Sequence, residues 1–224
     1  MSLVAAVVVP AAPALLPGIG GAADPLGGLR DRARRLVRET LADAKGGPLL
    51  LVVGSGRTTR TWPVDAPSGA ARFTTGRVPE GALPTALEIG RELAPPGGGE
   101  PALRSIAADA GPTECLALGR QLEVEGPAVL VIVADGPATL TEKAPGHLQP
   151  DADPFAAGLS RVLDDGDAGA LADLDPATCD RLWMRGRPAL QVLAGAFADR
   201  DVVSGEVVAD EAPFGVQYLL ARWL

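Results

Sequence analysis

Four short apolar runs, rich in Val and Ile, constrain most strongly what this chain can fold into. They span residues 3–9, 48–54, 128–134 and 202–208, and each is bounded by Gly, Pro or Asp. Continuous apolar runs of this length are typical of strands covered on both faces, because a half-exposed strand alternates apolar and polar residues. Helical patterns separate the runs. The sequence therefore predicts an α/β fold, a three-layer sandwich with a central mixed, largely parallel sheet flanked by helices.

Residue pairs that end in proline mark the expected helix starts. Aspartate accepts hydrogen bonds from the free amides of the first turn, and proline presets φ at the first helical position. We expect a helix after each of three such pairs, which are Asp24-Pro25, Asp153-Pro154 and Asp175-Pro176. Gly111-Pro112 predicts another helix through Leu122, and Leu83-Pro84 predicts one that runs to about Leu93.

Two further regions have less regular patterns. Residues 56–82 are rich in Thr, Arg, Gly and Pro without periodicity, which predicts irregular strands or a long loop at one end of the sheet. Residues 203–221 are expected to add one or two late strands, and the apolar stretch 218–224 fits a final core strand better than an interface edge. With 47% hydrophobic residues, the chain can bury one sizeable core, so we interpret 1–224 as a single domain.

The charge of the chain argues against nucleic acid as a partner. The net charge is −8 and the pI is about 4.7, whereas phosphate binding needs clustered cations. The densest basic run, 30–38, follows an amphipathic helix pattern and is interpreted as a solvated helix face.

Apolar and cysteine patterns predict a cytoplasmic protein without a membrane span. The N-terminal apolar run is only about seven residues long, against the ~20 that cross a bilayer. Cys115 and Cys179 are far apart in helix-like stretches, so they provide neither a CxxC metal spacing nor a disulfide framework.

His147 is the only histidine of the chain, which removes many kinds of metal and general-base chemistry. Ligands of open α/β sheets bind beyond the carboxyl ends of strands, so the candidate segments are 10–17, 54–60, 135–150 and 210–215. The first of these carries no side-chain donor or acceptor and can only shape a pocket.

The segment after the second apolar run is Gly54-Ser55-Gly56-Arg57. Its small residues would let backbone amides face an anion beside Arg57, with Ser55 as a further ligand-binding candidate. A strand-ending turn without a ligand is the alternative that we favour, because the segment lacks the lysine of a P-loop and glycine often simply marks loops.

The densest set of polar side chains follows the third apolar run. Asp135 and Thr139 are ligand-binding candidates, and Glu142, Lys143 and His147 are candidate catalytic residues. The alternative is an ordinary solvated loop with a surface histidine.

Glu211 is the last candidate for ligand binding. A hard metal ion would accept its carboxylate, but one carboxylate and one distant imidazole do not make a site of two histidines and a carboxylate. Structural capping or an ion pair, with Lys143 or with an arginine, is the alternative that we favour.

Several segments, taken in order, match one family pattern, namely 9–17, 51–54, 107–109 with 113–115, 135–146, 191–195 and 210–216. These segments resemble the LigB-like superfamily of class III extradiol dioxygenases, in particular a small actinobacterial branch without the metal-ligand histidines. The resemblance covers most of the chain. It implies a mixed sheet flanked by helices and, in active members, Fe(II) held by two histidines and a glutamate, with a further histidine acting as acid and base on a catechol.

The chain departs from the family pattern at the expected ligands. Ala11 stands where relatives carry the histidine of Pro-His-Pro-Pro, and neither 54–57 nor 136–139 contains a histidine. Glu211 is the one acidic residue that matches the family's glutamate. Because alanine has no donor atom, the resemblance implies a dismantled iron site, and we expect no metal and no cofactor unless an Fe(II) site has been rebuilt.

We therefore expect a LigB-like protein that binds a small polar or anionic ligand, or a partner protein, in the surviving pocket. This predicts that Arg57 converges there with the four residues Glu142, Lys143, His147 and Glu211. The alternatives are a non-oxidative enzyme that uses those four residues, for example a hydrolase or an isomerase, and an active iron-dependent ring-cleavage dioxygenase. The resemblance also implies that the protein can form a homo-oligomer.

Overall fold

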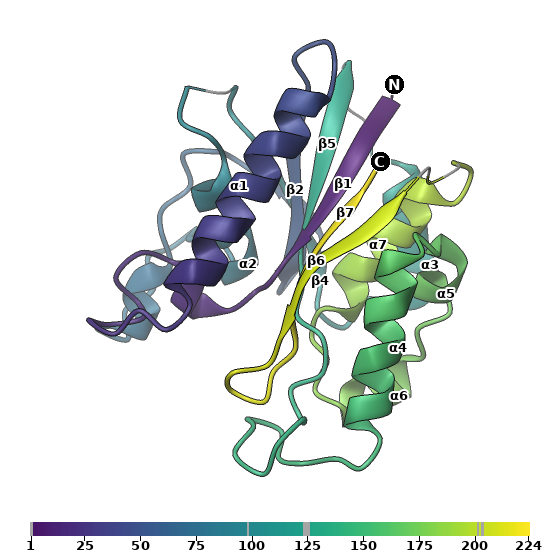
Figure 1. Ribbon diagram of the computed structural model, residues 1–224. Coiled ribbons are helices and arrows are strands. Elements are labelled where there is room, and N and C mark those ends of the chain that lie inside the picture. The colour runs from purple at the N-terminus through teal and green to yellow at the C-terminus, as the bar shows by residue number, and fades with distance from the viewer. Residues whose placement is uncertain (1, 98, 123–125, 201, 203) are drawn as a thin grey trace.

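Three of the four predicted apolar runs form interior strands of one seven-stranded sheet in the computed structural model, which describes residues 2–97, 99–122, 126–200, 202 and 204–224 (Figure 1). The strand order is β3-β4-β2-β5-β1-β7-β6. The strands are β1 (Ser2–Val9), β2 (Leu49–Gly56), β3 (Arg60–Trp62), β4 (Ala102–Ala107), β5 (Pro127–Val133), β6 (Gly205–Glu211) and β7 (Tyr218–Trp223). Neighbours among β4, β2, β5 and β1 are parallel, whereas β3, β7 and β6 pair antiparallel with theirs.

Helices cover both faces of the sheet, which confirms the predicted three-layer fold. The layer on one face contains α1 (Gly27–Asp43) and α2 (Thr85–Leu93) (Figure 1). The layer on the other contains α3 (Pro112–Arg120), α4 (Ala152–Asp164), α5 (Ala168–Ala172), α6 (Pro176–Arg181) and α7 (Arg187–Phe197). Two short 3-10 helices, η1 (Pro13–Leu15) and η2 (Ala70–Phe73), lie in the loops after β1 and β3.

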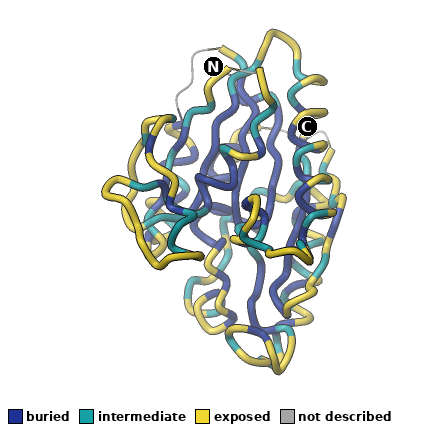
Figure 2. The backbone as a smooth tube through the Cα atoms, turned by 90° about the vertical axis from the view of Figure 1, so that its left-hand side faces the viewer, coloured by how far each residue is buried: buried dark blue, intermediate teal, exposed yellow. Residues whose placement is uncertain are grey.

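Successive strand residues point into opposite layers, as a pleated strand requires. Val7 and Val9 of β1 pack in the cluster that contains α1 and α2, whereas Ala6 and Val8 pack in the cluster of α3 and α7. Both sets are almost fully buried. Figure 2 shows the central strands as a buried core between exposed loops.

The structure differs from the predicted elements in several places. Strand β4 was not predicted, because Arg104 and Ser105 interrupt its apolar pattern. The run 202–208 becomes strand β6 three residues later, at 205–211, and it is a partly exposed edge strand instead of a strand covered on both faces. Residue 203 lies outside the described residues.

A helix begins at or near each of the three Asp-Pro pairs, but only one of the three aspartates caps its helix as predicted. The Asp175 carboxylate accepts the Thr178 amide at 2.8 Å and caps α6. Asp24 does not cap α1, because both of its carboxylate oxygens bind the guanidinium of the buried Arg30. Asp153 lies inside α4, which begins one residue earlier, at Ala152.

The expectation of a core strand at the C-terminal stretch is confirmed. The apolar C-terminal stretch forms β7, which lies inside the sheet between β1 and β6. Cys115 and Cys179 are both buried free thiols. Within the described residues, none of the helices combines the length and the apolar character needed to cross a membrane.

Two glycines bring the backbones of α3 and α7 into direct contact. A Cβ atom on Gly119 would overlap the carbonyl oxygen of Val192, and one on Gly195 would overlap that of Leu116. The two helices therefore pack more closely than any side chain allows. This contact fixes the position of α7, which begins directly after Arg185 and Gly186.

We expect Gly195→Ala to lower the free energy of unfolding by about 1–3 kcal/mol, because the added methyl group must push the two helices apart. Gly158→Ala is the matched control, since Gly158 lies within α4 and has open space where its Cβ would be. That control should be neutral or stabilising by up to ~1 kcal/mol through helix propensity. Urea denaturation measures both values, and equal effects at the two positions would contradict the close packing.

Candidate functional site

The connections after neighbouring strands diverge at the carboxyl ends of the parallel strands. After β2 the chain passes through β3 and η2 to α2 in one helical layer, whereas the neighbours of β2, β4 and β5, lead to α3 and α4 in the other. Loops that leave a sheet toward opposite faces open a crevice between them, which is where α/β proteins bind ligands.

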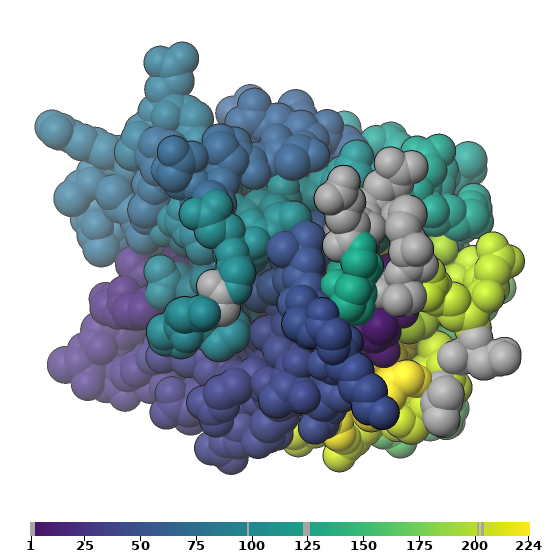
Figure 3. Space-filling view, turned by 90° about the horizontal axis from the view of Figure 1, so that it is seen from above, coloured from purple at the N-terminus to yellow at the C-terminus, as the bar shows by residue number. Residues whose placement is uncertain are grey.

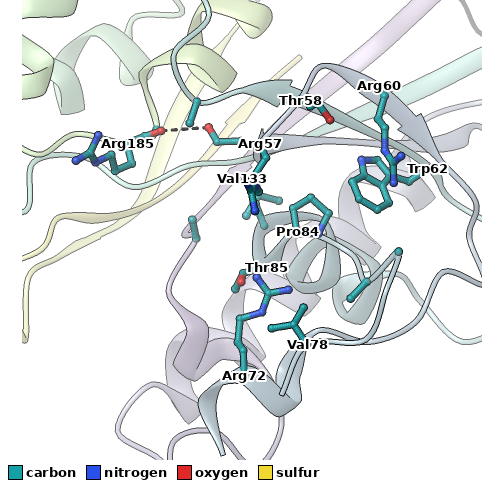
Figure 4. A pocket seen from close by; sticks show the side chains of 18 of the residues that line it. Arg57, Thr58, Arg60, Trp62, Arg72, Val78, Pro84, Thr85, Val133 and Arg185 are labelled. Carbon is teal, nitrogen blue, oxygen red and sulfur yellow. Dashed lines mark hydrogen bonds between the residues drawn. The ribbon is translucent and has the colours of Figure 1, made fainter. Parts of the chain in front are cut away.

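A cavity of about 1010 Å³ lies in this crevice. Its floor is formed by residues that end or follow the parallel strands, namely Ala11, Ser55, Gly56, Ala108, Val133 and Asp135. Its outer wall comes from the loop between β3 and α2 and from the first residues of α2 (Figure 4). The start of β1 and the end of β7 lie at the opposite end of the sheet (Figures 1 and 3).

Arginines dominate the charge of this cavity. Arg57, Arg60, Arg72 and Arg185 line it, against the two acids Glu80 and Asp135. Within the described residues, none of the four arginines forms an ion pair with a carboxylate. The cavity is therefore a region of positive potential in a protein whose net charge is −8.

The four arginines differ in the contacts that their guanidinium groups make. The Arg60 guanidinium stacks on the ring of Trp62, 3.5 Å from its centre, and that of Arg185 lies 5.9 Å from the ring of Trp183. Arg57 is exposed, whereas Arg72 is half-buried and held by backbone carbonyls.

Asp135 is the acid on the cavity floor. Its carboxylate accepts the backbone amide of Ala11 at 2.7 Å, which ties the end of β5 to the end of β1. Burial raises the pKa of Asp135 to about 7, and the amide hydrogen bond opposes this shift. Burial, with a smaller contribution from the charge of Asp135, raises the pKa of Tyr218 to about 12.

Ser55, Arg57 and Asp135 are the sequence-predicted site residues that the structure brings to the cavity. The hydroxyl of Ser55 donates to the carbonyl oxygen of Arg185 at 3.1 Å, so it joins the end of β2 to the segment before α7. Ser55 thus acts on the shape of the cavity, while Arg57 and Asp135 carry its charge.

The other predicted residues do not line the cavity. Thr139 is fully buried and its hydroxyl lies 3.4 Å from the carbonyl oxygen of Leu182. Glu142, Lys143 and His147 lie on an exposed loop, where Nδ1 of His147 is 2.9 Å from the carbonyl oxygen of Glu142. This arrangement is that of a solvated loop.

Glu211 is also away from the cavity. It forms an ion pair with Arg32 of α1 and not with Lys143. The expected convergence of Glu211 and the 142–147 loop with Arg57 is therefore not seen in the structure.

The described residues do not fit an iron site. No three His, Cys, Asp or Glu side chains in that part of the chain come together in a way that would hold a metal ion. At the cavity floor, Ala11 offers only its backbone, and its amide is bonded to Asp135. A site of two histidines and a carboxylate cannot be built from these groups.

Sequence reasoning missed several cavity residues. Three of them lie in the region 56–82 without periodicity, namely Trp62, Arg72 and Glu80. The fourth, Arg185, lies between α6 and α7. The richness of 56–82 in Thr and Arg was the one signal, and it did not show which side chains turn inward.

Comparison with known proteins supports the fold. The chain is similar to a solved structure, that of the uncharacterized protein JW3007 from Escherichia coli K12, with a TM-score of 0.54 and 14% sequence identity. The similarity covers 98% of this chain and 99% of that one. At this identity, the likeness shows a shared three-layer α/β fold and nothing about activity. No protein-family model and no curated protein matches the chain significantly.

We expect Asp135→Asn to make the protein more stable than the wild type at pH 8 and to change little at pH 4. The native carboxyl keeps its proton up to a pH of about 7, whereas the unfolded carboxyl loses it near 3.8. The stability of the wild type therefore falls as the pH rises between these values, and asparagine removes this loss. The gain at pH 8 should be on the order of 2 kcal/mol.

Urea denaturation at pH 4, 6 and 8 measures this difference. Asp65→Asn, at an exposed position, is the control and should change the stability by less than ~0.5 kcal/mol. A gain for Asp135→Asn that does not depend on pH would show that its carboxyl is not desolvated.

Proposed function

We propose that this protein binds a small organic anion in the cavity at the carboxyl ends of the parallel strands. The observation that carries the proposal is the presence of four arginines on that cavity without a carboxylate partner among the described residues. Guanidinium groups bind carboxylates and phosphates through paired hydrogen bonds, and a partly enclosed site strengthens these bonds.

The walls of the cavity favour an anion with an apolar body. Trp62, Val78, Pro84 and Val133 line it between the charged groups. Ligand sites in proteins combine such apolar walls with a few polar groups that fix orientation. An aromatic or branched carboxylate would bury its carbon skeleton there and pair its charge with an arginine.

Asp135 would make this binding depend on pH. Below its pKa of about 7 the carboxyl is neutral and can donate a hydrogen bond, and above it the negative charge would repel an anion. The affinity for an anion should therefore be higher at pH 6 than at pH 8.5.

We further propose that the chain is a LigB-like relative in which the iron site has been lost. The segments that resemble the family, the three-layer fold and the place of the cavity support this relationship. Ala11 and the absence of a metal-binding cluster in the described residues support the loss of the iron site. The free, buried cysteines are compatible with a cytoplasmic location, which stays a proposal.

Calorimetric titration at pH 6 with benzoate and with benzylamine tests the proposed function. The two probes share a ring and differ in charge, so we expect benzoate to bind and benzylamine not to bind. Arg57→Ala/Arg72→Ala should weaken benzoate binding at least ~10-fold, as expected for the loss of charged hydrogen bonds of about 1.5–3 kcal/mol each.

The control removes the same charge elsewhere. Arg38→Ala/Arg120→Ala replaces two exposed arginines on α1 and α3 that do not line the cavity, and it should change the affinity less than twofold. If benzoate and benzylamine bind equally, or if neither benzoate nor phenyl phosphate binds, the cavity is not an anion site.

A further inference from the structure

We infer that Arg72 and Thr85 form the subsite that holds the anionic group of the ligand, and that the other cavity arginines attract the ligand without fixing it. The inference rests on the proposed function and deepens it, because it assigns the anion to one wall of the cavity. The group bound there is an oxyanion with at least two oxygens.

The Arg72 guanidinium is oriented before any ligand arrives. Its Nε donates to the carbonyl oxygen of Gly69 at 2.8 Å, and its Nη2 donates to that of Leu83 at 2.9 Å. Both acceptors are neutral, so they fix the planar group but leave its charge uncompensated. Nη1 has no protein partner within the described residues. A guanidinium held in this way loses little conformational freedom when it binds an anion.

The loop that carries these carbonyls is itself fastened to α2. The buried carboxylate of Glu88 accepts the amide of Gly69 at 2.9 Å and the hydroxyl of Ser68. Arg91 donates from Nη1 to the carbonyl oxygens of Val64 and Ala66, at 3.0 and 2.8 Å. Two side chains of α2 therefore hold the loop on one side, and Arg72 points from it into the cavity (Figure 4).

Thr85 supplies a second donor on the same wall of the cavity as Arg72. It is the first residue of α2 and lines the cavity, and Arg72 points toward it in Figure 4. The acceptor of Arg72 Nη2, the Leu83 carbonyl, is only two residues before Thr85. A hydroxyl and a guanidinium on one wall of a cavity can bind two oxygens of the same carboxylate or phosphate.

The remaining arginines are less suited to hold an anion in place. Arg57 and Arg185 are exposed, so solvent screens their charge, and within the described residues no hydrogen bond from the protein fixes either guanidinium. Arg60 stacks on Trp62. These three raise the local concentration of anions, whereas the subsite at Arg72 determines which ligand stays bound.

The test uses benzoate and phenyl phosphate as probes, titrated at pH 6 by calorimetry into the wild type and into variants. Arg72→Ala should weaken the probe that binds at least ~10-fold, and Arg72→Lys should weaken it less, because lysine keeps the charge without the planar fork. Arg77→Ala, which removes an exposed charge of the same loop outside the cavity lining, should change the affinity less than twofold.

Gly69→Ala tests orientation without removing any charge. Its φ of −92° suits alanine, but the new Cβ would overlap Nη2 of Arg72 and displace the guanidinium. We expect it to weaken binding about as much as Arg72→Ala, and thermal melting of each variant verifies that the fold is retained. For a folded Gly69→Ala, unchanged affinity would contradict the inference.

The outcomes separate the two proposals. If the wild type binds neither probe, both proposals fail. If it binds a probe and Arg57→Ala weakens binding more than Arg72→Ala does, the cavity is an anion site but the subsite is not at Arg72. A loss at Arg72 with benzoate assigns a carboxylate to the subsite, and a loss only with phenyl phosphate assigns a phosphate.

Discussion

The burial of the parallel strands on both faces is the constraint on which the rest of the structure depends. Every residue of β5 from Ala128 to Val133 is at most 1% exposed, because helices cover it from two sides. Polar side chains without hydrogen-bond partners are excluded from such faces, since burying an unpaired polar group costs several kcal/mol. Ligand contacts are therefore confined to the strand ends and to the loops that leave them, and the cavity lies at those ends.

Hydrogen bonds beside the cavity connect the segments that follow the strands. Asp135 binds the amide of Ala11, and Ser55 binds the carbonyl oxygen of Arg185. The same edge of the sheet is thus organised by hydrogen bonds between loops.

Local pattern predicts the central strands well, because their apolar runs follow directly from burial on both faces. It misses β4 for an equally physical reason. Ser105 is buried there and is satisfied by the Thr58 carbonyl and by the indole N–H of Trp62, partners more than 40 residues away in the sequence. A local pattern contains no information about such distant partners, so a buried serine looks like a break in the strand.

The candidate site shows the same limit. Asp135 could be predicted from its place after a buried strand, because strand ends of α/β sheets converge. Arg72 could not, since its importance comes from carbonyl oxygens that the loop and α2 position together. The polar richness of residues 142–147 was misleading because those side chains face solvent on a loop.

The place of β7 has a consequence for how the chain folds. β1 pairs on one side with β7, so Val8 lies opposite Ala221, and the ladder joins residues that are separated by almost the whole chain. During synthesis that side of β1 stays open until residues 218–223 have emerged. Contacts of such sequence separation form slowly, and an open apolar edge invites pairing with other chains. The pairing of β1 is therefore completed only after nearly the whole chain has been made.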